Sequence, residues 1–309
     1  MTIDAHHHLW DLQAREHRWL MGGQPWASDE ELAALRRSYR LQDLAPLAEA
    51  AGVTGTVVIQ TVAEPWETPD LLALAAGRDP YAATDQPAQA GSAAPGPALP
   101  RGLLAGVVGW TDLTAPGVAD DVAGLRALPG GRFLRGIRHP VLVEPDPGWL
   151  AGPAVLAGLR ALATTDLVFD VVVLPHQWPA AVTAARSVPE LTFVLDHLGA
   201  PPAESGQGAT GGPWAEAIRD LAALPNVVCK LSGAHTSPAR ASDLRPYYET
   251  VLAAFGPERL MFGSDWPVSS LAASYGQVHA LYRELTARLS PAQQDAIFAG
   301  TARRVYQLR

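Results

Sequence analysis

Three consecutive histidines, His6, His7 and His8, lie near the start of the chain in the stretch IDAHHHLW. The run is shorter than a purification tag, and apolar residues flank it as they would a buried strand. Side chains two positions apart on a strand share a face, so His6 and His8 are expected to point one way and His7 the other. Two converging imidazoles can share one divalent ion. We therefore predict that His6 and His8 are site residues; structural histidines are the alternative.

A carboxylate that could work with these histidines is Asp265, in the stretch GSDWP. It follows an apolar run and precedes Trp266 and a proline, so it lies at the end of an expected strand. A carboxylate beside imidazoles or a metal can take a proton from water as a general base. An aspartate that merely caps the next segment is the structural alternative. We predict a catalytic Asp265 and a substrate contact from Trp266.

Two more histidines follow expected strands. His197, in LDHLG, is predicted to belong to the site, and alternation along a strand would turn its neighbour Asp196 to the opposite face. His176, in LPHQW, lies beyond its strand in a turn that could simply be exposed. It remains a candidate for contacting substrate or for adding a ligand to a metal.

The remaining candidates are basic. Arg138 and His139, in RGIRHP, are predicted to bind substrate oxygens. Lys230 is the only lysine of the chain and lies on an apolar stretch. It could be catalytic, or it could reach a carboxylate inside the fold as a structural residue.

Eight short β-branched runs, separated by Ala/Leu-rich helical segments, organise the chain. Strands that alternate with helices pair in parallel, and eight such units in about 300 residues are typical of an α/β fold of the (β/α)8 TIM-barrel type. We predict one such domain over residues 1–309. The expected strands are 2–8, 55–62, 103–111, 132–139, 167–174, 191–198, 226–232 and 259–266.

In such a barrel the chemistry lies at the carboxyl ends of the strands, where the candidate residues above fall. Two Ala/Pro/Gly-rich stretches interrupt the repeat and are expected to be flexible insertions, near 78–101 and 201–213. The second follows the sixth strand, so it is either a lid over the site or a tolerated surface loop.

The composition limits the classes of partner that we expect for this chain. The net charge of −8 offers no basic patch for nucleic acid or anionic membranes, and no apolar run is long enough to span a bilayer. A single cysteine, Cys229, excludes an internal disulfide and favours a cytoplasmic location. A small molecule is the expected partner, and the oligomeric state, a homo-oligomer included, is left open.

With these residues in view, the chain resembles the amidohydrolase superfamily, within the group that includes L-fuconolactonase and other sugar-acid and dicarboxylate lactonases. The stretches GIRH and EPDPGWL are more similar to the fuconolactonase branch than to the pyrone-dicarboxylate branch. The resemblance covers nearly the whole chain, in the stretches IDAHHHLW, LAPLAEAAGVTGTVVIQ, RGIRHPVLVEPDPGWL, FVLDHLGAP, NVVCKLSG, RLMFGSDWPV and IFAGTARRVYQL.

The resemblance implies a hydrolase in which water attacks the carbonyl of a lactone, with a sugar-derived 1,4-lactone as the expected substrate. It assigns Asp265 the role of general base and places His6, His8 and His197 around the carbonyl. Arg138 and His139 would hold substrate oxygens and stabilise the developing oxyanion.

The expected cofactor is one divalent metal or none. Binuclear members of the superfamily use a carboxylated lysine on the fourth strand, whereas the only lysine here is expected on the seventh. Zn²⁺ is the preferred candidate, held by His6, His8 and Asp265 with His176 or His197. A metal-independent enzyme remains an alternative.

Two other functions are weighed against the lactonase. A metal-dependent decarboxylase of the same barrel superfamily would also begin with His-x-His and end with an aspartate. A barrel that binds a ligand without catalysis is less favoured, because ligand-type residues follow the first, sixth and eighth strands.

Overall fold

The computed structural model describes residues 1–81, 102–201, 209–233 and 241–308, with only the backbone for 241–243. The described helices include none that is both long and apolar enough to cross a membrane. Most of the expected insertion near 78–101 and part of that near 201–213 lie outside the described residues.

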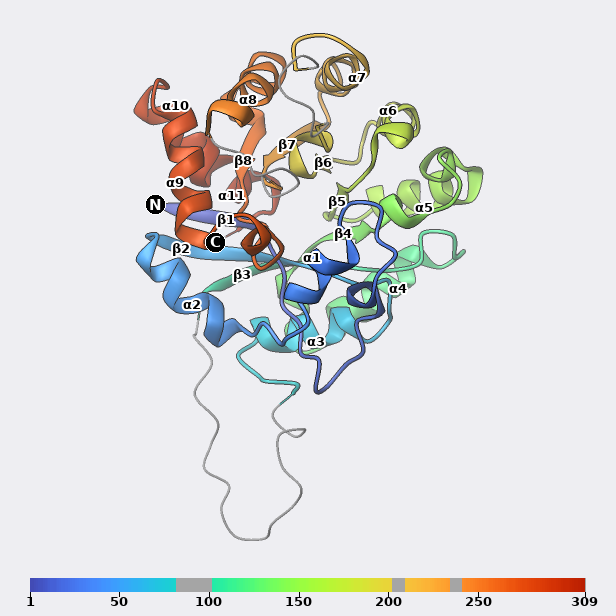
Figure 1. Ribbon diagram of the computed structural model, residues 1–309. Helices are drawn as coiled ribbons and strands as arrows, with labels where there is room; N and C mark the ends of the chain where they lie inside the picture. The colour runs from blue at the N-terminus through green and yellow to red at the C-terminus, as the bar shows by residue number, and fades with distance from the viewer. Residues whose placement is uncertain (82–101, 202–208, 234–240, 309) are drawn as a thin grey trace, which may run out of the picture.

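Eight parallel strands form one sheet in the order β1 to β8, so each strand pairs with the next along the chain. Figure 1 shows the strands at the centre with helices around them. The predicted (β/α)8 barrel is confirmed. The strands are β1 (Thr2–His7), β2 (Val53–Ile59), β3 (Leu104–Gly109), β4 (Leu134–His139), β5 (Val168–Val171), β6 (Phe193–Leu195), β7 (Val227–Leu231) and β8 (Leu260–Phe262).

A helix follows each strand, and shorter helices extend the two ends of the chain. The helices are α1 (Asp29–Ala34), α2 (Leu41–Ala50), α3 (Glu67–Ala75), α4 (Val118–Ala127), α5 (Pro153–Ala163), α6 (Trp178–Ser187), α7 (Pro213–Ala222), α8 (Ala241–Phe255), α9 (Tyr275–Thr286), α10 (Pro291–Asp295) and α11 (Thr301–Val305). A π-helical turn, Ala296–Gly300, joins the last two.

Apolar side chains fill the interior of the barrel below the polar mouth. Residues Val57, Val168 and Val228 from three strands meet there with Met261. Tyr306, just after α11, packs against the same cluster, so the carboxyl-terminal segment closes this end of the barrel. Because the interior is packed, polar chemistry is confined to the opposite, carboxyl ends of the strands.

An irregularity in β1 decides which of its residues face the interior. Asp4 pairs with Thr56 and His7 with Val58, so one more residue is used on β1 than on β2. Such a bulge breaks the alternation of side chains. Ala5 packs in the apolar interior, and the adjacent His6 also faces inward, toward the polar mouth.

The barrel closes between β8 and β1. A few backbone hydrogen bonds join this pair, in place of the regular ladder that joins the other neighbouring strands. A bridge between His7 and Trp266 joins β1 to the segment that follows β8. The Asp265 amide donates to the His6 carbonyl at 2.8 Å, and the His8 amide donates to the Trp266 carbonyl at 2.7 Å. This seam lies directly beside the candidate site residues of both strands.

Two helix glycines provide a test of the packing of the outer layer. A Cβ at Gly158, in α5, would overlap the Leu113 carbonyl oxygen, whereas a Cβ at Gly124, in α4, would meet open space. We expect Gly158→Ala to lower the free energy of unfolding by about 1–3 kcal/mol through overpacking. The matched Gly124→Ala should be neutral or stabilise by up to about 1 kcal/mol. Urea unfolding measures both, and equal effects would contradict the close approach of α5.

Candidate active site

Three ligand-type atoms meet at the mouth of the barrel, where β1 and β8 end. His6 Nε2 lies 3.2 Å from His8 Nε2 and 3.5 Å from Asp265 Oδ1. His8 Nε2 lies 3.3 Å from the same Asp265 oxygen. All three residues are buried, and together they form a group that could hold a metal ion.

The spacing of these atoms fits a tetrahedral metal. Ligands that bind Zn²⁺ tetrahedrally at about 2.0–2.1 Å are separated from one another by about 3.3 Å. His8 also has the required tautomer, because its Nδ1 lies 2.9 Å from the Ile59 carbonyl oxygen and must donate to it. The His8 Nε2 lone pair is therefore available to an ion. His6, His8 and Asp265 are the residues that would hold one.

His6 is held from its other side by charged groups. Its Nδ1 lies 3.3 Å from Asp196 Oδ1 and 3.1 Å from Lys230 Nζ. Burial lowers the pKa of His6 well below its usual value, although Asp196 opposes that shift. The imidazole is therefore neutral at pH 7, as a metal ligand must be.

Lys230 lies at the floor of the site and is fully buried. Its ammonium group lies 2.5 Å from Asp170 Oδ2 and 3.0 Å from Asp196 Oδ1. The Tyr306 hydroxyl donates to the same Asp170 carboxylate at 2.8 Å. Lys230 thus reaches carboxylates inside the barrel, as the structural alternative predicts, and its place on β7 excludes it as a strand-four bridging ligand.

Asp196 faces the site, contrary to the expectation that it would face away from His197. Its Oδ2 accepts a hydrogen bond from Arg138 Nη1 at 3.0 Å. The expectation was wrong because β6 ends at Leu195 and His197 adopts a left-handed φ of 55°, so strand alternation no longer applies. Burial favours a raised pKa at Asp196, but Lys230 and His6 outweigh it and hold that pKa well below the usual value.

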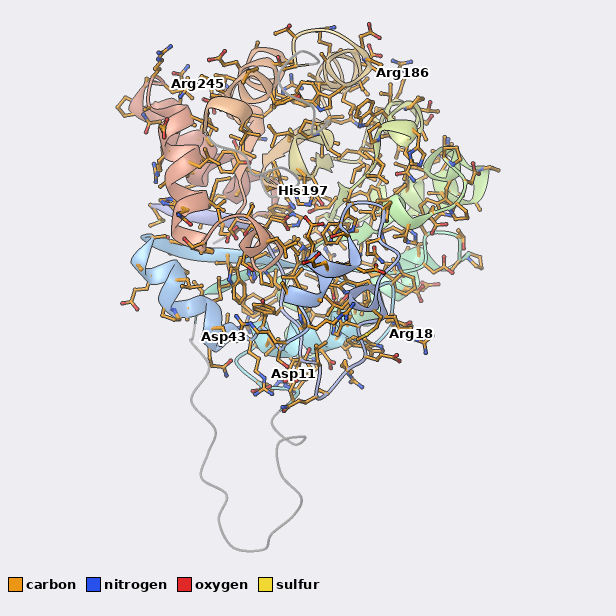
Figure 2. All side chains as sticks on the ribbon, viewed as in Figure 1. Asp11, Arg18, Asp43, Arg186, His197 and Arg245 are labelled. Atoms are coloured by element: carbon orange, nitrogen blue, oxygen red, sulfur yellow. The ribbon has the colours of Figure 1, made fainter. Side chains whose placement is uncertain are left out.

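His197 comes to the same mouth as His6. The two imidazole rings lie 4.6 Å apart between centroids, and His197 Nδ1 lies 3.9 Å from Asp265 Oδ2. Ser232 Oγ, 2.9 Å from that Nδ1, orients the ring. Figure 2 shows His197 near the centre of the barrel. His6, Asp196 and His197 form a second group that could hold a metal, sharing His6 with the first.

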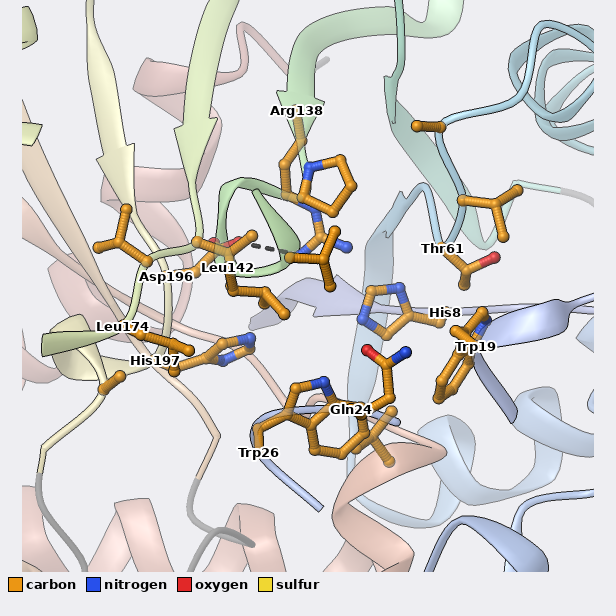
Figure 3. A pocket seen from close by; sticks show the side chains of 18 of the residues that line it. His8, Trp19, Gln24, Trp26, Thr61, Arg138, Leu142, Leu174, Asp196 and His197 are labelled. Atoms are coloured by element: carbon orange, nitrogen blue, oxygen red, sulfur yellow. Dashed lines mark hydrogen bonds and ion pairs between the residues drawn. The ribbon is translucent and has the colours of Figure 1, made fainter. Parts of the chain in front are cut away.

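A cavity of about 790 Å³ opens above these residues. Figure 3 shows Trp26 and Gln24 across the cavity from Arg138, with His8 and His197 on either side. Its polar floor contrasts with an aromatic and aliphatic upper wall. The lining includes His8, Arg138, Asp196, His197 and Asp265 below, and Trp19, Gln24, Trp26, Trp66, Leu142 and Leu174 above.

Three of the predicted substrate contacts lie outside the cavity lining. His139 follows the inward-facing Arg138 on β4 and therefore points outward, where its ring stacks on Trp149 at 4.2 Å. His176 is exposed in the turn after β5. Trp266 is buried against Tyr39, with 5.4 Å between ring centroids. Of the predicted contacts, the structure brings Arg138 to the cavity.

His7 occupies the position that strand parity predicts for it. Its Nε2 lies 3.0 Å from Thr56 Oγ1, away from the metal-binding groups described above. Burial lowers the pKa of His7 to about 3, so this imidazole is neutral and packs as part of the structure.

Glu67, at the start of α3, holds the cavity-lining segment after β2 and was not singled out from the sequence. Its carboxylate accepts hydrogen bonds from the amides of Thr61 and Val62 and from the Thr61 hydroxyl. Burial raises the pKa of Glu67 from 4.5 to about 7, although these hydrogen bonds oppose the rise. One glutamate two residues after Pro65 carries no pattern in the sequence that indicates this role.

Comparisons with known proteins show the family of the chain. A family model described as Amidohydrolase matches residues 3–308. The chain belongs to the amidohydrolase family. This amidohydrolase is 38% identical to an L-fucono-1,5-lactonase of Burkholderia multivorans over all of the chain and 96% of the relative. It is 34% identical to an L-fucono-1,5-lactonase of Burkholderia ambifaria over 99% of the chain and 95% of that relative.

Solved structures of other amidohydrolases match the fold of this amidohydrolase. A crystal structure of an amidohydrolase from Burkholderia multivorans with bound zinc matches with a TM-score of 0.82 and 35% identity, covering all of both chains. An amidohydrolase from Bifidobacterium longum subsp. infantis matches with a TM-score of 0.70 at 24% identity, which shows the shared fold. The resemblance stated from the sequence is confirmed.

The three neighbouring histidines provide a test of the site. We expect His6→Ala or His8→Ala to weaken Zn²⁺ binding by at least tenfold, because each removes one of the three residues that could hold the ion. His7→Ala should keep the Zn²⁺ affinity and lower only stability, because His7 contacts Thr56 instead. A colorimetric chelator competition measures the affinity. Equal loss in all three variants would contradict the assigned ligand set.

The raised pKa of Glu67 predicts a specific pH dependence of stability. The folded chain keeps a proton that the unfolded chain releases, so the stability contributed by this group is full below about pH 4.5 and is lost as the pH rises toward 7. Glu67→Gln should therefore make the fall in free energy of unfolding between these pH values shallower. Urea unfolding at several pH values tests this. The exposed Glu190→Gln serves as control, and an unchanged slope in Glu67→Gln would contradict the prediction.

Proposed function

We propose that the chain is a lactonase that opens a sugar-derived lactone, with Asp265 as the general base. The observation that carries the proposal is the meeting of Asp265 with His6 and His8 at the floor of the cavity. The names of the two full-length relatives, L-fucono-1,5-lactonase, support the same reaction class.

In the proposed reaction, a water beside Asp265 attacks the lactone carbonyl carbon while Asp265 takes its proton. The carbon–oxygen bond of the ring then breaks, and the ring oxygen receives that proton, which leaves a hydroxy acid. Arg138 supports the developing oxyanion. Arg138 lines the cavity and is held in place by its ion pair with Asp196, so its guanidinium can face the substrate oxygens.

One divalent metal, with Zn²⁺ as the preferred ion, belongs to the proposal. When bound, such an ion supplies polarisation of a carbonyl and a lowered pKa for water. The imidazole and carboxylate donors of His6, His8 and Asp265 suit Zn²⁺, and their spacing supports it. His197 is the proposed neighbour that would contact the reacting water or the carbonyl.

The charges of the cavity favour an uncharged substrate. Its two arginines are already paired: Arg138 with Asp196 at 3.0 Å, and the exposed Arg18 with Glu16 at 3.3 Å. The described lining carries four carboxylates, Glu16, Glu64, Asp196 and Asp265, against these two arginines. With one bound dication the charges of the lining would sum to about zero, so the cavity has no surplus positive charge for two carboxylates, which supports a neutral sugar lactone over a dicarboxylate lactone.

The upper wall suits a sugar ring. Indole faces, from Trp19, Trp26 and Trp66, pack well against C–H groups, and the Gln24 amide can bond to ring hydroxyls. The resemblance seen in the sequence implies a 1,4-lactone, whereas the names of the relatives support the 1,5-lactone ring. The substrate that we propose is a neutral aldonolactone, and its ring size is decided by assaying both forms.

A lactone panel followed by release of acid tests the proposal, with and without a chelator. We expect neutral aldono-1,5- and 1,4-lactones to be opened and dicarboxylate lactones to be poor substrates. Asp265→Asn should lower kcat by about 10²- to 10⁴-fold because it removes the general base. Asp295→Asn, which changes an exposed carboxylate on α10, is the control and should retain activity.

The outcomes of the panel separate the competing functions. Absence of turnover with every lactone would contradict the proposal. Carbon dioxide release from a carboxylated aromatic would instead support a decarboxylase. Full activity in Asp265→Asn would refute the assigned mechanism even if lactones are opened.

A further inference from the structure

Asp4, two residues before His6, is a fully buried carboxylate with four hydrogen-bond donors around it. Its Oδ1 accepts from the backbone amides of His6 at 3.1 Å and Ser264 at 2.8 Å. Its Oδ2 accepts from the Ser264 hydroxyl at 2.6 Å and the Tyr275 hydroxyl at 3.0 Å. One carboxylate therefore ties β1, the segment after β8 and helix α9 together. We call Asp4, Ser264 and Tyr275 the Asp4 cluster.

The Asp4 cluster lies at the seam of the barrel. Strand β1 and the segment after β8 meet there through the bridge between His7 and Trp266. Ser264 strengthens the seam, because its hydroxyl oxygen lies 3.3 Å from the His6 carbonyl oxygen and accepts from the Trp266 amide at 3.1 Å. The two backbone segments that carry His6 and Asp265 are thus fixed to a single buried anion.

Asp265 needs such support because its backbone is strained. It adopts φ 56°, a left-handed conformation that residues with a Cβ rarely occupy. A residue keeps such a conformation only when its surroundings impose it. Its flanking residues, Ser264 and Trp266, are both held by hydrogen bonds of the cluster, and its own amide donates to the His6 carbonyl.

We propose that Asp4 is a positioning residue that sets the distance between His6 Nε2 and Asp265 Oδ1. Asp4 touches neither the cavity nor the ligand atoms, and it acts through the backbones of His6 and Ser264. Loosening the cluster moves a histidine ligand and the general base relative to each other. Zn²⁺ affinity and kcat then fall together, while substrate contacts in the upper cavity are kept. The part that concerns kcat rests on the proposed lactonase function.

The test compares two buried tyrosines of the same helix, α9. Tyr275→Phe removes one donor from Asp4 and leaves the ring in place. Tyr282→Phe is the matched control, because the Tyr282 hydroxyl is buried and has no hydrogen-bond partner among the described residues. Each variant, with Asp4→Asn and the unaltered protein, is assayed for Zn²⁺ affinity by chelator competition and for kcat and KM with the best lactone.

We expect Tyr275→Phe and Asp4→Asn to weaken Zn²⁺ binding by about 10- to 100-fold, the range found when a residue that orients a metal ligand is changed. The value of kcat should fall together with the Zn²⁺ affinity, because a positioning defect acts on the reacting groups. The KM should stay within about twofold of that of the unaltered protein. Tyr282→Phe should match the unaltered protein in all three quantities. A general packing defect would change the Zn²⁺ affinity and kcat of both tyrosine variants to the same extent.

The results separate this proposal from the lactonase proposal. If no lactone is opened but Tyr275→Phe alone of the tyrosine variants loses Zn²⁺ affinity, the role of Asp4 stands and the lactonase function fails. If lactones are opened and both Tyr275→Phe and a folded Asp4→Asn keep the original affinity and kcat, the role of Asp4 is overturned. Equal losses of Zn²⁺ affinity in Tyr275→Phe and Tyr282→Phe also overturn the role of Asp4. The same holds if the protein binds no measurable Zn²⁺ and the variants keep the original kcat. Should Asp4→Asn fail to fold, Tyr275→Phe decides.

Discussion

A lysine ammonium buried at the centre of the barrel constrains the whole site. A charge removed from water is tolerated only when opposite charges and hydrogen bonds surround it, and Lys230 meets Asp170, Asp196 and His6. Asp196 is shared, because Arg138 binds its other oxygen. The direction of His6, the direction of Arg138 and the ionisation of Asp196 therefore depend on one buried cation. Removing it would leave two carboxylates facing each other in the interior.

Strand periodicity predicted the framework of this site, since it depends on local geometry. The period of two places His6 and His8 on one face and His7 on the other, and the rule for barrels places Asp265 at the same end of the fold. All eight strands are found, although β6 is three residues long where eight were predicted. It ends early because the chain turns into a left-handed conformation at His197.

The rest of the site depends on contacts that periodicity does not contain. Asp196 joins the site because of that turn, and the turn needs Gly233, where a Cβ would lie 2.6 Å from the His197 Cβ. His139 shows the opposite error, since the alternation that brings Arg138 inward turns its neighbour outward. The tryptophan wall comes from connecting segments, whose positions over the cavity follow from tertiary packing rather than from a repeating pattern.

Burial of the histidines bears on both proposed roles of Asp265, as a metal ligand and as a general base. Desolvation lowers the pKa of His6 and of His197, so both rings are neutral at pH 7. A protonated His6 would repel a cation and would pair with the Asp265 carboxylate, 3.5 Å away, which is the proposed general base. Neutral imidazoles do not neutralise the Asp265 carboxylate on this side of His6, which suits the proposed binding of a dication and the proposed uptake of a proton from water. Burial therefore has two effects in this site. It makes the Lys230 ammonium depend on nearby carboxylates, and it keeps His6 neutral on the side that faces Asp265.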